Sequence, residues 1–228
     1  MNICGFQKLT LLDYPEHTAC TLFTGGCNMR CPFCHNTPLV TGECEEIYSE
    51  DEILSFLNKR QGLLDGVAVT GGEPLMQKDI AEFFRKIKEL GFDIKLDTNG
   101  SFPDKLRELI DNSLVDFIAM DVKNVFTKYE ETSGSKINTD IIKKSIDIIK
   151  NSNIPHEFRT TVVSPFHTEE DIISIAQYLG ATEKYYIQCF KDSGDILCDG
   201  CSAPSEEMLR SASEKAQKYV LLCETRGI

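Results

Sequence analysis

Segments with strand character alternate with segments of helical spacing along nearly the whole chain, six times in succession. Runs of β-branched and apolar residues predict strands at 18–24, in GVAVTGGEP (66–74), and at 92–100, 115–123, 156–163 and 184–190. Helical spacing and capping residues predict helices after Ser49 and at 78–90, 103–112, 141–149, 168–179 and 206–223. Because each connection can hold a helix, the alternation predicts a parallel sheet. Six units can lie open or close partly, and we expect an α/β fold: a partial (β/α)6 TIM-like barrel, with parallel strands and outer helices.

The chain of 228 residues has no linker or low-complexity segment, so we expect a single domain over 1–228. Within it we predict an N-terminal extension (1–17), the barrel core (18–190) and a C-terminal loop and helix (191–228). No run of about 18 apolar residues is present, and the N-terminus lacks the pattern of a secretory signal. We therefore expect a cytoplasmic protein with no membrane partner.

The formal net charge of −12 argues against broad, non-specific binding to nucleic acid or to an anionic membrane. Ten cysteines in a chain without an export signal are instead expected to bind metal or to be buried thiols, because a reducing cytosol disfavours disulfides. We expect Cys4, Cys20 and Cys44 to be reduced thiols, with Cys20 as a small core residue.

The residues best suited to chemistry cluster where the predicted strands end. These are the loop Cys27–Cys34, the run Gly71–Gly72–Glu73, the run Asp97–Thr98–Asn99, and Asp121 with Lys123. Because ligands bind at the carboxyl ends of parallel strands, we expect these segments to form one site.

Cys27, Cys31 and Cys34 are spaced as CxxxCxxC on a short loop after two glycines. About 0.02 such triplets are expected by chance at this cysteine frequency. Thiolates on such a loop suit iron–sulfur or zinc, and three ligands leave one iron of a [4Fe-4S] cubane open to a substrate. The alternative is a zinc site completed by His35.

This spacing, with aromatic Phe33 before the third cysteine, resembles the signature of the radical S-adenosylmethionine superfamily. The resemblance implies a [4Fe-4S] cluster on Cys27, Cys31 and Cys34 as the catalytic centre. The methionine moiety of S-adenosyl-L-methionine would chelate the open iron. Electron transfer would cleave the sulfonium C–S bond and yield a 5′-deoxyadenosyl radical.

Later segments extend the resemblance over most of the chain. Gly71, Gly72 and Glu73 resemble the family's GGE motif, which holds the methionine amino group, and Phe33 is similar to a residue that meets the adenine. LDYP before the first strand, CHN after the third cysteine, LDTNG (96–100) and DVK (121–123) resemble the activating enzymes of glycyl radical enzymes. The anaerobic ribonucleoside-triphosphate reductase activating protein is the type that they resemble most.

That resemblance implies cosubstrate contacts for the run Asp97–Thr98–Asn99 and for Lys123, on the ribose and the methionine carboxylate. A cation bound by Asp97, Thr98 and Asp121 is a further hypothesis. The alternative for the two acids is a turn or capping role. We predict that Arg159 faces the barrel interior and the cosubstrate, with an outside ion pair as its alternative. We expect His167 to be an exposed residue at a helix entry.

The C-terminal cysteines form a second, weaker pattern. Cys198 and Cys201 form a CxxC pair, and with Cys189 and Cys223 they could bind a second cluster or zinc. Too few residues separate Cys34 from Ser49 for a ferredoxin-like insert, which favours an activating enzyme with one cluster.

The resemblance thus implies a radical SAM activase that takes a glycine Cα hydrogen from a partner glycyl radical enzyme, and a flavodoxin or ferredoxin reductant. One alternative is a radical enzyme that acts on a small molecule such as a nucleoside. An alternative of another class is an iron–sulfur electron carrier or a zinc-binding scaffold, neither of which would cleave S-adenosylmethionine.

Overall fold

The computed structural model describes residues 1–41, 44, 47–181, 184–192, 194 and 196–228. Its eight strands form one sheet in which the spatial order repeats the chain order, β1 to β8. All neighbouring pairs are parallel except β1 with β2. The strands are β1 (Ile3–Thr10), β2 (Ala19–Thr24), β3 (Gly66–Gly71), β4 (Asp93–Thr98), β5 (Phe117–Asp121), β6 (His156–Val162), β7 (Lys184–Cys189) and β8 (Leu222–Arg226).

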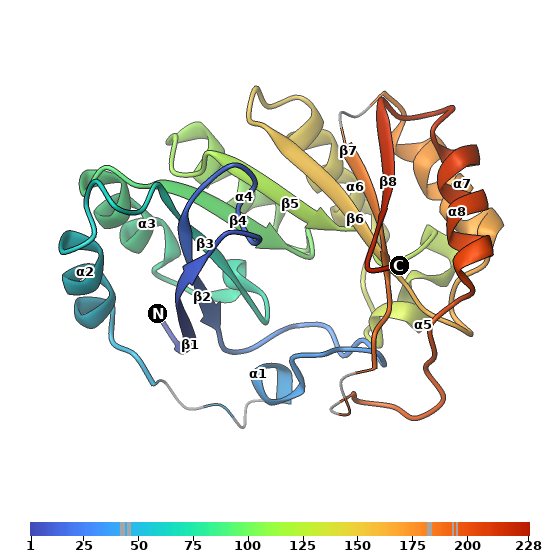
Figure 1. Ribbon diagram of the computed structural model, residues 1–228, viewed down its shortest axis with the longest axis horizontal. Coiled ribbons are helices and arrows are strands. Elements are labelled where there is room, and N and C mark those ends of the chain that lie inside the picture. The colour runs from blue at the N-terminus through green and yellow to red at the C-terminus, as the bar shows by residue number, and fades with distance from the viewer. Residues whose placement is uncertain (42–43, 45–46, 182–183, 193, 195) are drawn as a thin grey trace.

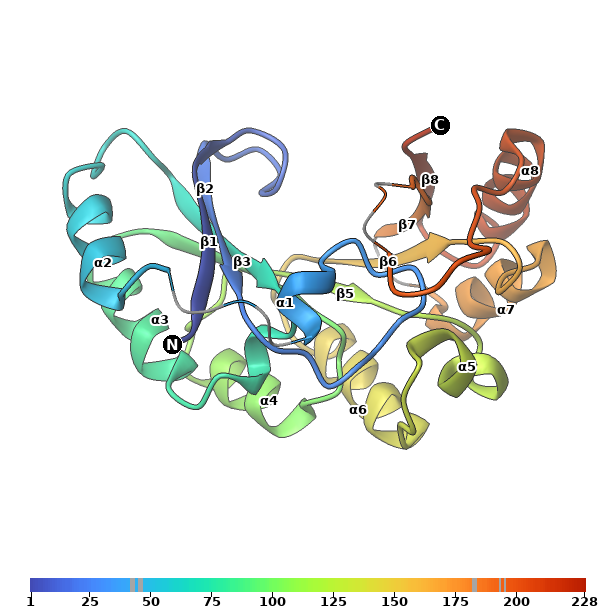
Figure 2. The ribbon, with the colours of Figure 1, turned by 90° about the horizontal axis from the view of Figure 1, so that it is seen from below.

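Helices follow the strands and cover the outer face of the curved sheet. The helices are α1 (Thr37–Thr41), α2 (Glu50–Asn58), α3 (Ile80–Glu89), α4 (Pro103–Asp111), α5 (Tyr129–Ser133), α6 (Thr139–Lys150), α7 (Glu169–Leu179) and α8 (Glu206–Ala216), with short 3-10 turns at Pro74–Met76 and Phe126–Lys128. Figure 2 shows the sheet as an open trough with most of these helices along its outside, whereas α1 belongs to the loop after β2 and lies away from that outer layer.

The sheet does not close. β1 and β8 lie at its two ends, and Figure 1 shows them on either side of the space enclosed by the trough. The prediction of a partial barrel with parallel strands and outer helices is confirmed. Two strands were missed in the sequence: β1 falls in the predicted N-terminal extension (1–17), and β8 falls in the predicted C-terminal segment (191–228), where it begins within the last residues of the predicted helix.

Local sequence signals explain most helix boundaries. Ser49 and Glu52 form the predicted capping box at the start of α2, and Thr168 forms a second one with Asp171 at the start of α7. The prediction of one helix over 206–223 is wrong, because α8 ends at Ala216. The side chain of Gln217 there accepts a hydrogen bond from the Cys223 N–H at 2.8 Å, which turns the chain into β8.

The core lies between the outer face of the sheet and the helices. Phe83, Phe84 and Ile87 of α3 are fully buried there, as are Phe158 and Ile187 of the sheet. Alternate residues of each strand therefore point the other way, into the trough. Those inward positions carry the polar residues of the sheet, and they are where a ligand can bind.

Two contacts fix the N-terminal segment of the chain: the packing of Tyr14 against the sheet and the pairing of Cys4 with Cys44. Tyr14 of the LDYP segment is 2% exposed, stacks on His17 at 3.9 Å between ring centroids, and packs with Ala19, Phe117 and Ala119. Cys4 is paired with Cys44 as a disulfide, with 6.0 Å between the two Cα atoms, so the expectation of reduced thiols is wrong for this pair. Cys20 is the buried core residue that was predicted. Within the described residues, no helix is long and apolar enough to cross a membrane.

Candidate functional site

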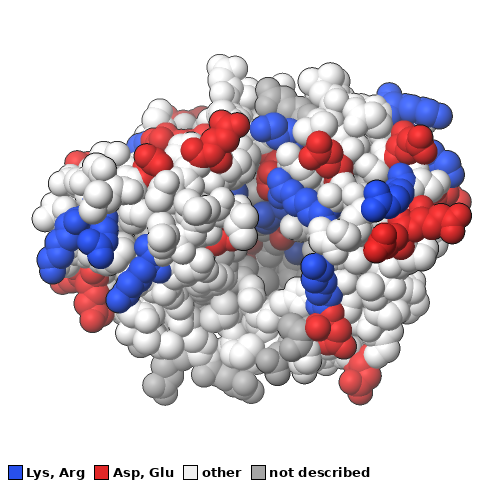
Figure 3. Space-filling view, viewed as in Figure 1, with Lys and Arg blue, Asp and Glu red and all other residues white. Residues whose placement is uncertain are grey.

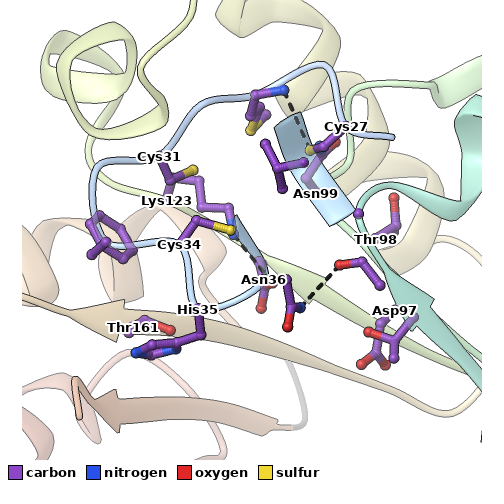
Figure 4. Close-up of a pocket in the computed structure, with 17 residues that line it drawn as sticks. Cys27, Cys31, Cys34, His35, Asn36, Asp97, Thr98, Asn99, Lys123 and Thr161 are labelled. Carbon is purple, nitrogen blue, oxygen red and sulfur yellow. Dashed lines mark hydrogen bonds and ion pairs between the residues drawn. The ribbon is translucent and has the colours of Figure 1, made fainter. Parts of the chain in front are cut away.

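The three cysteines of the CxxxCxxC segment lie on the loop between β2 and α1, and all three line one pocket (Figure 4). The pocket sits at the carboxyl ends of the strands, as predicted. Backbone hydrogen bonds fix the loop: Gly26 N–H donates to the Leu39 carbonyl at 2.7 Å, and Arg30 N–H donates to the Ser133 carbonyl at 2.9 Å. The loop is therefore held from both α1 and α5.

The donor set fits an iron–sulfur cluster better than a single zinc ion. No three His, Cys, Asp or Glu side chains of the described residues gather closely enough to hold one metal ion. His35, the proposed fourth zinc ligand, hydrogen-bonds through Nε2 to the Lys191 carbonyl at 2.6 Å and stacks on Phe190. Figure 4 places it near Thr161, apart from the three sulfur atoms. Three soft thiols that lie too far apart to bind one metal ion suit a cluster of several iron atoms instead.

Burial and charge set the chemistry of these thiols. Burial raises the pKa of the Cys31 thiol to about 11, although the nearby Lys123 ammonium opposes the shift. Burial also raises the pKa of Cys27. A bound metal would have to displace these protons, because only thiolates are good ligands.

Gly71 and Gly72 line the same pocket through their backbone. Neither position has room for a side chain: a Cβ on Gly72 would lie 2.0 Å from the Gly26 carbonyl oxygen of the cysteine loop, and a Cβ on Gly71, which has φ of +118°, would meet the Thr24 backbone of β2. The two loops are joined by Glu73 N–H, which donates to the Gly26 carbonyl at 2.8 Å. The glycines are thus required by this close packing.

Glu73 does not line the pocket; it is fully buried behind it. Its carboxylate accepts hydrogen bonds from Thr98 Oγ1 at 2.8 Å, from Asn99 N–H at 2.7 Å and from Leu75 N–H at 3.1 Å. Burial raises the pKa of Glu73 to about 7, against the effect of these hydrogen bonds. Glu73 therefore connects the ends of β3 and β4, and its predicted contact with the methionine amino group stays a prediction.

Asn99 extends this connection to the cluster loop. Its Nδ2 lies 3.0 Å from Asn28 Oδ1 and 3.8 Å from Cys27 Sγ. Asn99 and Thr98 both line the pocket, and their cosubstrate contacts stay a prediction. The end of β4 is therefore in contact with Cys27.

Arg159 points into the trough, where it bridges two carboxylates. Its Nε donates to Asp121 Oδ1 at 2.9 Å, and its Nη1 lies 3.3 Å from Asp97 Oδ2. Lys123 Nζ lies 3.3 Å from the other oxygen of Asp121. Burial disfavours the ionised carboxyl of Asp121, but Arg159 and Lys123 outweigh it and lower its pKa to about 2. The inward orientation predicted for Arg159 agrees with these contacts.

The three residues of the cation hypothesis have protein partners in the structure. Arg159 supplies positive charge to both Asp97 and Asp121, and the Thr98 hydroxyl is directed to Glu73. A cation bound by these residues stays a hypothesis.

Phe33 and His167 form one wall beside the cysteines. Phe33 is 5% exposed and lines the pocket, with 6.2 Å between its ring centroid and that of His167. The prediction of an exposed His167 is wrong, since His167 is 6% exposed and its Nε2 lies 2.7 Å from the Lys123 carbonyl. It fixes the backbone of the DVK segment, and the loop after β6 folds inward to bring it there.

Several pocket residues were missed in the sequence. Asn36 donates from Nδ2 to the Gly71 carbonyl at 3.2 Å, which joins the CHN segment to the glycine loop. Thr161 lies two positions after Arg159, so strand alternation alone would have placed it on the inner face. The other missed lining residues are Met29, His35, Val40 and Thr70.

The structure does not bring the four C-terminal cysteines together. Cys223 is the register partner of Tyr185 on β7, whereas Cys189 lies four residues further along that strand, or about 13 Å at the usual rise. Cys198 is exposed, and its N–H donates to the Pro32 carbonyl at 3.0 Å. This separation argues against one site made by all four thiols, and a second cluster on the C-terminal cysteines stays an untested hypothesis.

The chain is similar to known proteins in both sequence and fold. The profile described as the radical SAM superfamily matches residues 21–179. A Methanocaldococcus jannaschii protein named as a glycyl-radical enzyme activating enzyme is 37% identical over 231 residues, covering 96% of this chain and 92% of that protein. The pyruvate formate-lyase 1-activating enzyme of Escherichia coli is 24% identical over 238 residues, covering 96% of each. Streptococcus suis SuiB bound to S-adenosylmethionine shares the fold, with a TM-score of 0.71 and 16% identity over 89% of this chain and 48% of SuiB.

Proposed function

Because the chain belongs to the radical S-adenosylmethionine superfamily, we propose that it activates a glycyl radical enzyme. The observation that carries the proposal is the 37% identity, over nearly both full lengths, to a protein named as such an activating enzyme. The substrate would be a glycine Cα–H of a partner protein, and anaerobic ribonucleotide reductase is the partner that we propose to test first. A flavodoxin or ferredoxin would be the reductant.

The residues of the site suit this chemistry. Cys27, Cys31 and Cys34 would hold a [4Fe-4S] cluster, which when bound and reduced supplies the electron that cleaves the C–S bond of S-adenosylmethionine. Lys123 carries a positive charge into the pocket, where it can pair with the methionine carboxylate. The Asp97 carboxylate lines the same pocket and can accept hydrogen bonds from ribose hydroxyls.

The surrounding walls would orient the cosubstrate and exclude water. Phe33 offers an apolar face beside the cysteines, and the backbone of Gly71 and Gly72 offers polar groups without side chains. Arg159 holds Asp97 and Asp121 in place, which keeps the acidic strand ends in a fixed position. Such fixed positioning is the main contribution of a protein to cofactor chemistry.

The test is an anaerobic assay of the protein reconstituted with iron and sulfide and reduced with dithionite. We expect formation of 5′-deoxyadenosine, and a glycyl radical signal by electron paramagnetic resonance after the partner is added. Cys31→Ser should abolish both, whereas the exposed Cys198→Ser should keep both. No 5′-deoxyadenosine from the unaltered protein would refute the enzyme assignment. Normal cleavage with no radical on the partner would instead favour a small-molecule substrate.

A further inference from the structure

The cosubstrate pocket lies next to a chamber that reaches the open side of the sheet. Asp97 lines both the cosubstrate pocket and this chamber, whose other lining includes Leu11, Leu12 and Asp13 of the β1–β2 loop and Glu157, Gln188 and Arg226 of β6 to β8. A third hollow shares Thr161 with the pocket and Gln188 with the chamber. Figure 3 shows charged side chains around a hollow in the middle of this face. The three hollows are thus neighbours along the way from the cysteines to the seam between β1 and β8, which we call the open seam.

The chemistry of a glycine substrate dictates what the walls of these hollows must offer. Glycine has no side chain, so an enzyme can hold it only through the N–H and C=O groups of the main chain. A buried main-chain group that loses its hydrogen bonds to water and finds no protein partner weakens binding. An extended segment that enters at the open seam therefore needs hydrogen-bond donors and acceptors along the wall.

Arg226 stands at the open seam in a fixed orientation. Its Nη1 and Nη2 donate to the two carboxylate oxygens of Glu157 at 3.1 and 2.9 Å. Its guanidinium carbon lies 3.3 Å from the ring centroid of Tyr186. The Glu157 side chain is 2% exposed and the Arg226 side chain 38%. The buried carboxylate therefore fixes the guanidinium, which stays accessible from the open seam. The guanidinium has five N–H donors, more than this pair engages.

Gln188 is the register partner of Arg226 on the neighbouring strand β7. Both side chains line the chamber and the third hollow. The Gln188 Oε1 accepts only a long hydrogen bond of 3.5 Å from Thr161 Oγ1. An amide offers both a donor and an acceptor, which is the pair of functions that a peptide unit needs.

We propose that Gln188 and Arg226 bind the main chain of the glycine-bearing segment of the partner protein. Arg226 donates to carbonyl oxygens of this segment, and Gln188 pairs with a peptide unit next to it. The inference rests on the proposed function, and it assigns the two residues that hold the protein substrate at the open seam. The step is binding alone and moves no proton or electron.

The test uses reconstituted, full-length protein and a capped heptapeptide that copies the radical loop of the anaerobic ribonucleotide reductase of the same organism. Gln188→Leu removes the amide at similar size. The double variant Glu157→Gln/Arg226→Gln removes the ion pair without leaving a buried carboxylate. Arg159, whose Nη1 lies 3.8 Å from Glu157 Oε1, keeps Asp97 and Asp121 as partners. We expect both to raise the peptide Kd and the KM for the whole partner at least tenfold, with kcat changed less than threefold. Arg210→Gln, an exposed arginine on α8, is the matched control and should change neither.

A second peptide identifies the main chain as the target. Replacing the peptide bond after the glycine by an ester removes one N–H and weakens one carbonyl acceptor. The ester should raise the Kd about tenfold for the unaltered protein and less than threefold for Gln188→Leu, because the lost contact is the same. Melting temperature and iron content are measured for every variant, to exclude loss of folding.

Two results would overturn the inference. One is a peptide Kd within twofold of the unaltered value in both Gln188→Leu and the double variant. The other is an ester effect of equal size in the unaltered protein and in Gln188→Leu. Failure of the proposed function is a separate outcome, because it would appear as absent cosubstrate cleavage in the unaltered protein before any variant is compared.

Discussion

Replacing Gly72 with alanine tests whether the glycine loop and the cysteine loop must touch. The added Cβ would lie 2.0 Å from the Gly26 carbonyl oxygen and 2.6 Å from its carbon. Real Cβ contacts stay beyond about 3 Å, so the two loops must separate by about 1 Å. That movement would break the hydrogen bond from Glu73 N–H to the Gly26 carbonyl, now 2.8 Å long, and displace the adjacent Cys27.

The expected damage is larger for activity than for stability. Overpacking costs about 1–3 kcal/mol of unfolding free energy. A misplacement of about 1 Å in a reactive site can lower the rate about 100-fold. We therefore expect Gly72→Ala to stay folded and to form 5′-deoxyadenosine about 100-fold more slowly, with a changed electron paramagnetic resonance spectrum of the reduced protein.

Gly62→Ala is the control for this experiment. Gly62 also has no side chain, but a Cβ there would meet nothing within 4 Å, and only its φ of +75° makes alanine unfavourable. It should lose about 1 kcal/mol of stability and keep full activity. Cosubstrate cleavage by Gly72→Ala within threefold of the unaltered rate would refute the reasoning.

Three other predictions concern the residues around the site. Glu73→Gln tests the raised pKa: since the folded protein binds this proton more tightly, unaltered protein should lose stability relative to Glu73→Gln as the pH rises from 4.5 to about 7. The difference in unfolding free energy between the two proteins should change by about 3 kcal/mol over this pH range, and urea unfolding at several pH values measures it. A difference that does not change with pH would contradict the prediction. Arg159→Gln leaves two carboxylates without their shared cation and should raise the Kd for S-adenosylmethionine about tenfold in equilibrium dialysis; an unchanged Kd would count against the bridge. Cys198→Ser/Cys201→Ser should retain about four irons per chain, because the strand register separates Cys189 from Cys223 and so argues against a site of four thiols, and a fall from about eight to four irons would contradict the prediction.

The sheet and its main site could be predicted because their signals are local. The cysteine spacing, the capping box at Ser49 and the strand-end runs each lie within a few residues. β8 was missed because five residues carry little pattern, and its pairing with β7 is a tertiary contact. β1 was missed because its residues alternate poorly between buried and exposed positions.

The errors at single residues have a common physical origin. His167 was predicted to be exposed from its place in a loop, but that loop packs onto Lys123 from another strand end. Cys4 and Cys44 are 40 residues apart, and nothing in their local sequence indicates that they meet. Glu73 matches its motif, yet its burial behind the pocket depends on Thr98 and Asn99 of the next strand. Contacts between distant segments decide such positions, and a single sequence does not show them.

A sheet whose spatial order repeats its chain order also has consequences for how the molecule is built. Each new strand pairs with the strand that precedes it, so no strand has to be inserted between two that are already paired. Contacts of short sequence separation favour rapid folding, and such a sheet can grow along its edge as the chain emerges. The loop with Cys27, Cys31 and Cys34 precedes the strands that carry Asn99 and Lys123. The cysteine loop is therefore synthesised before the walls that enclose it, which would give assembly of the proposed cluster an early period of open access.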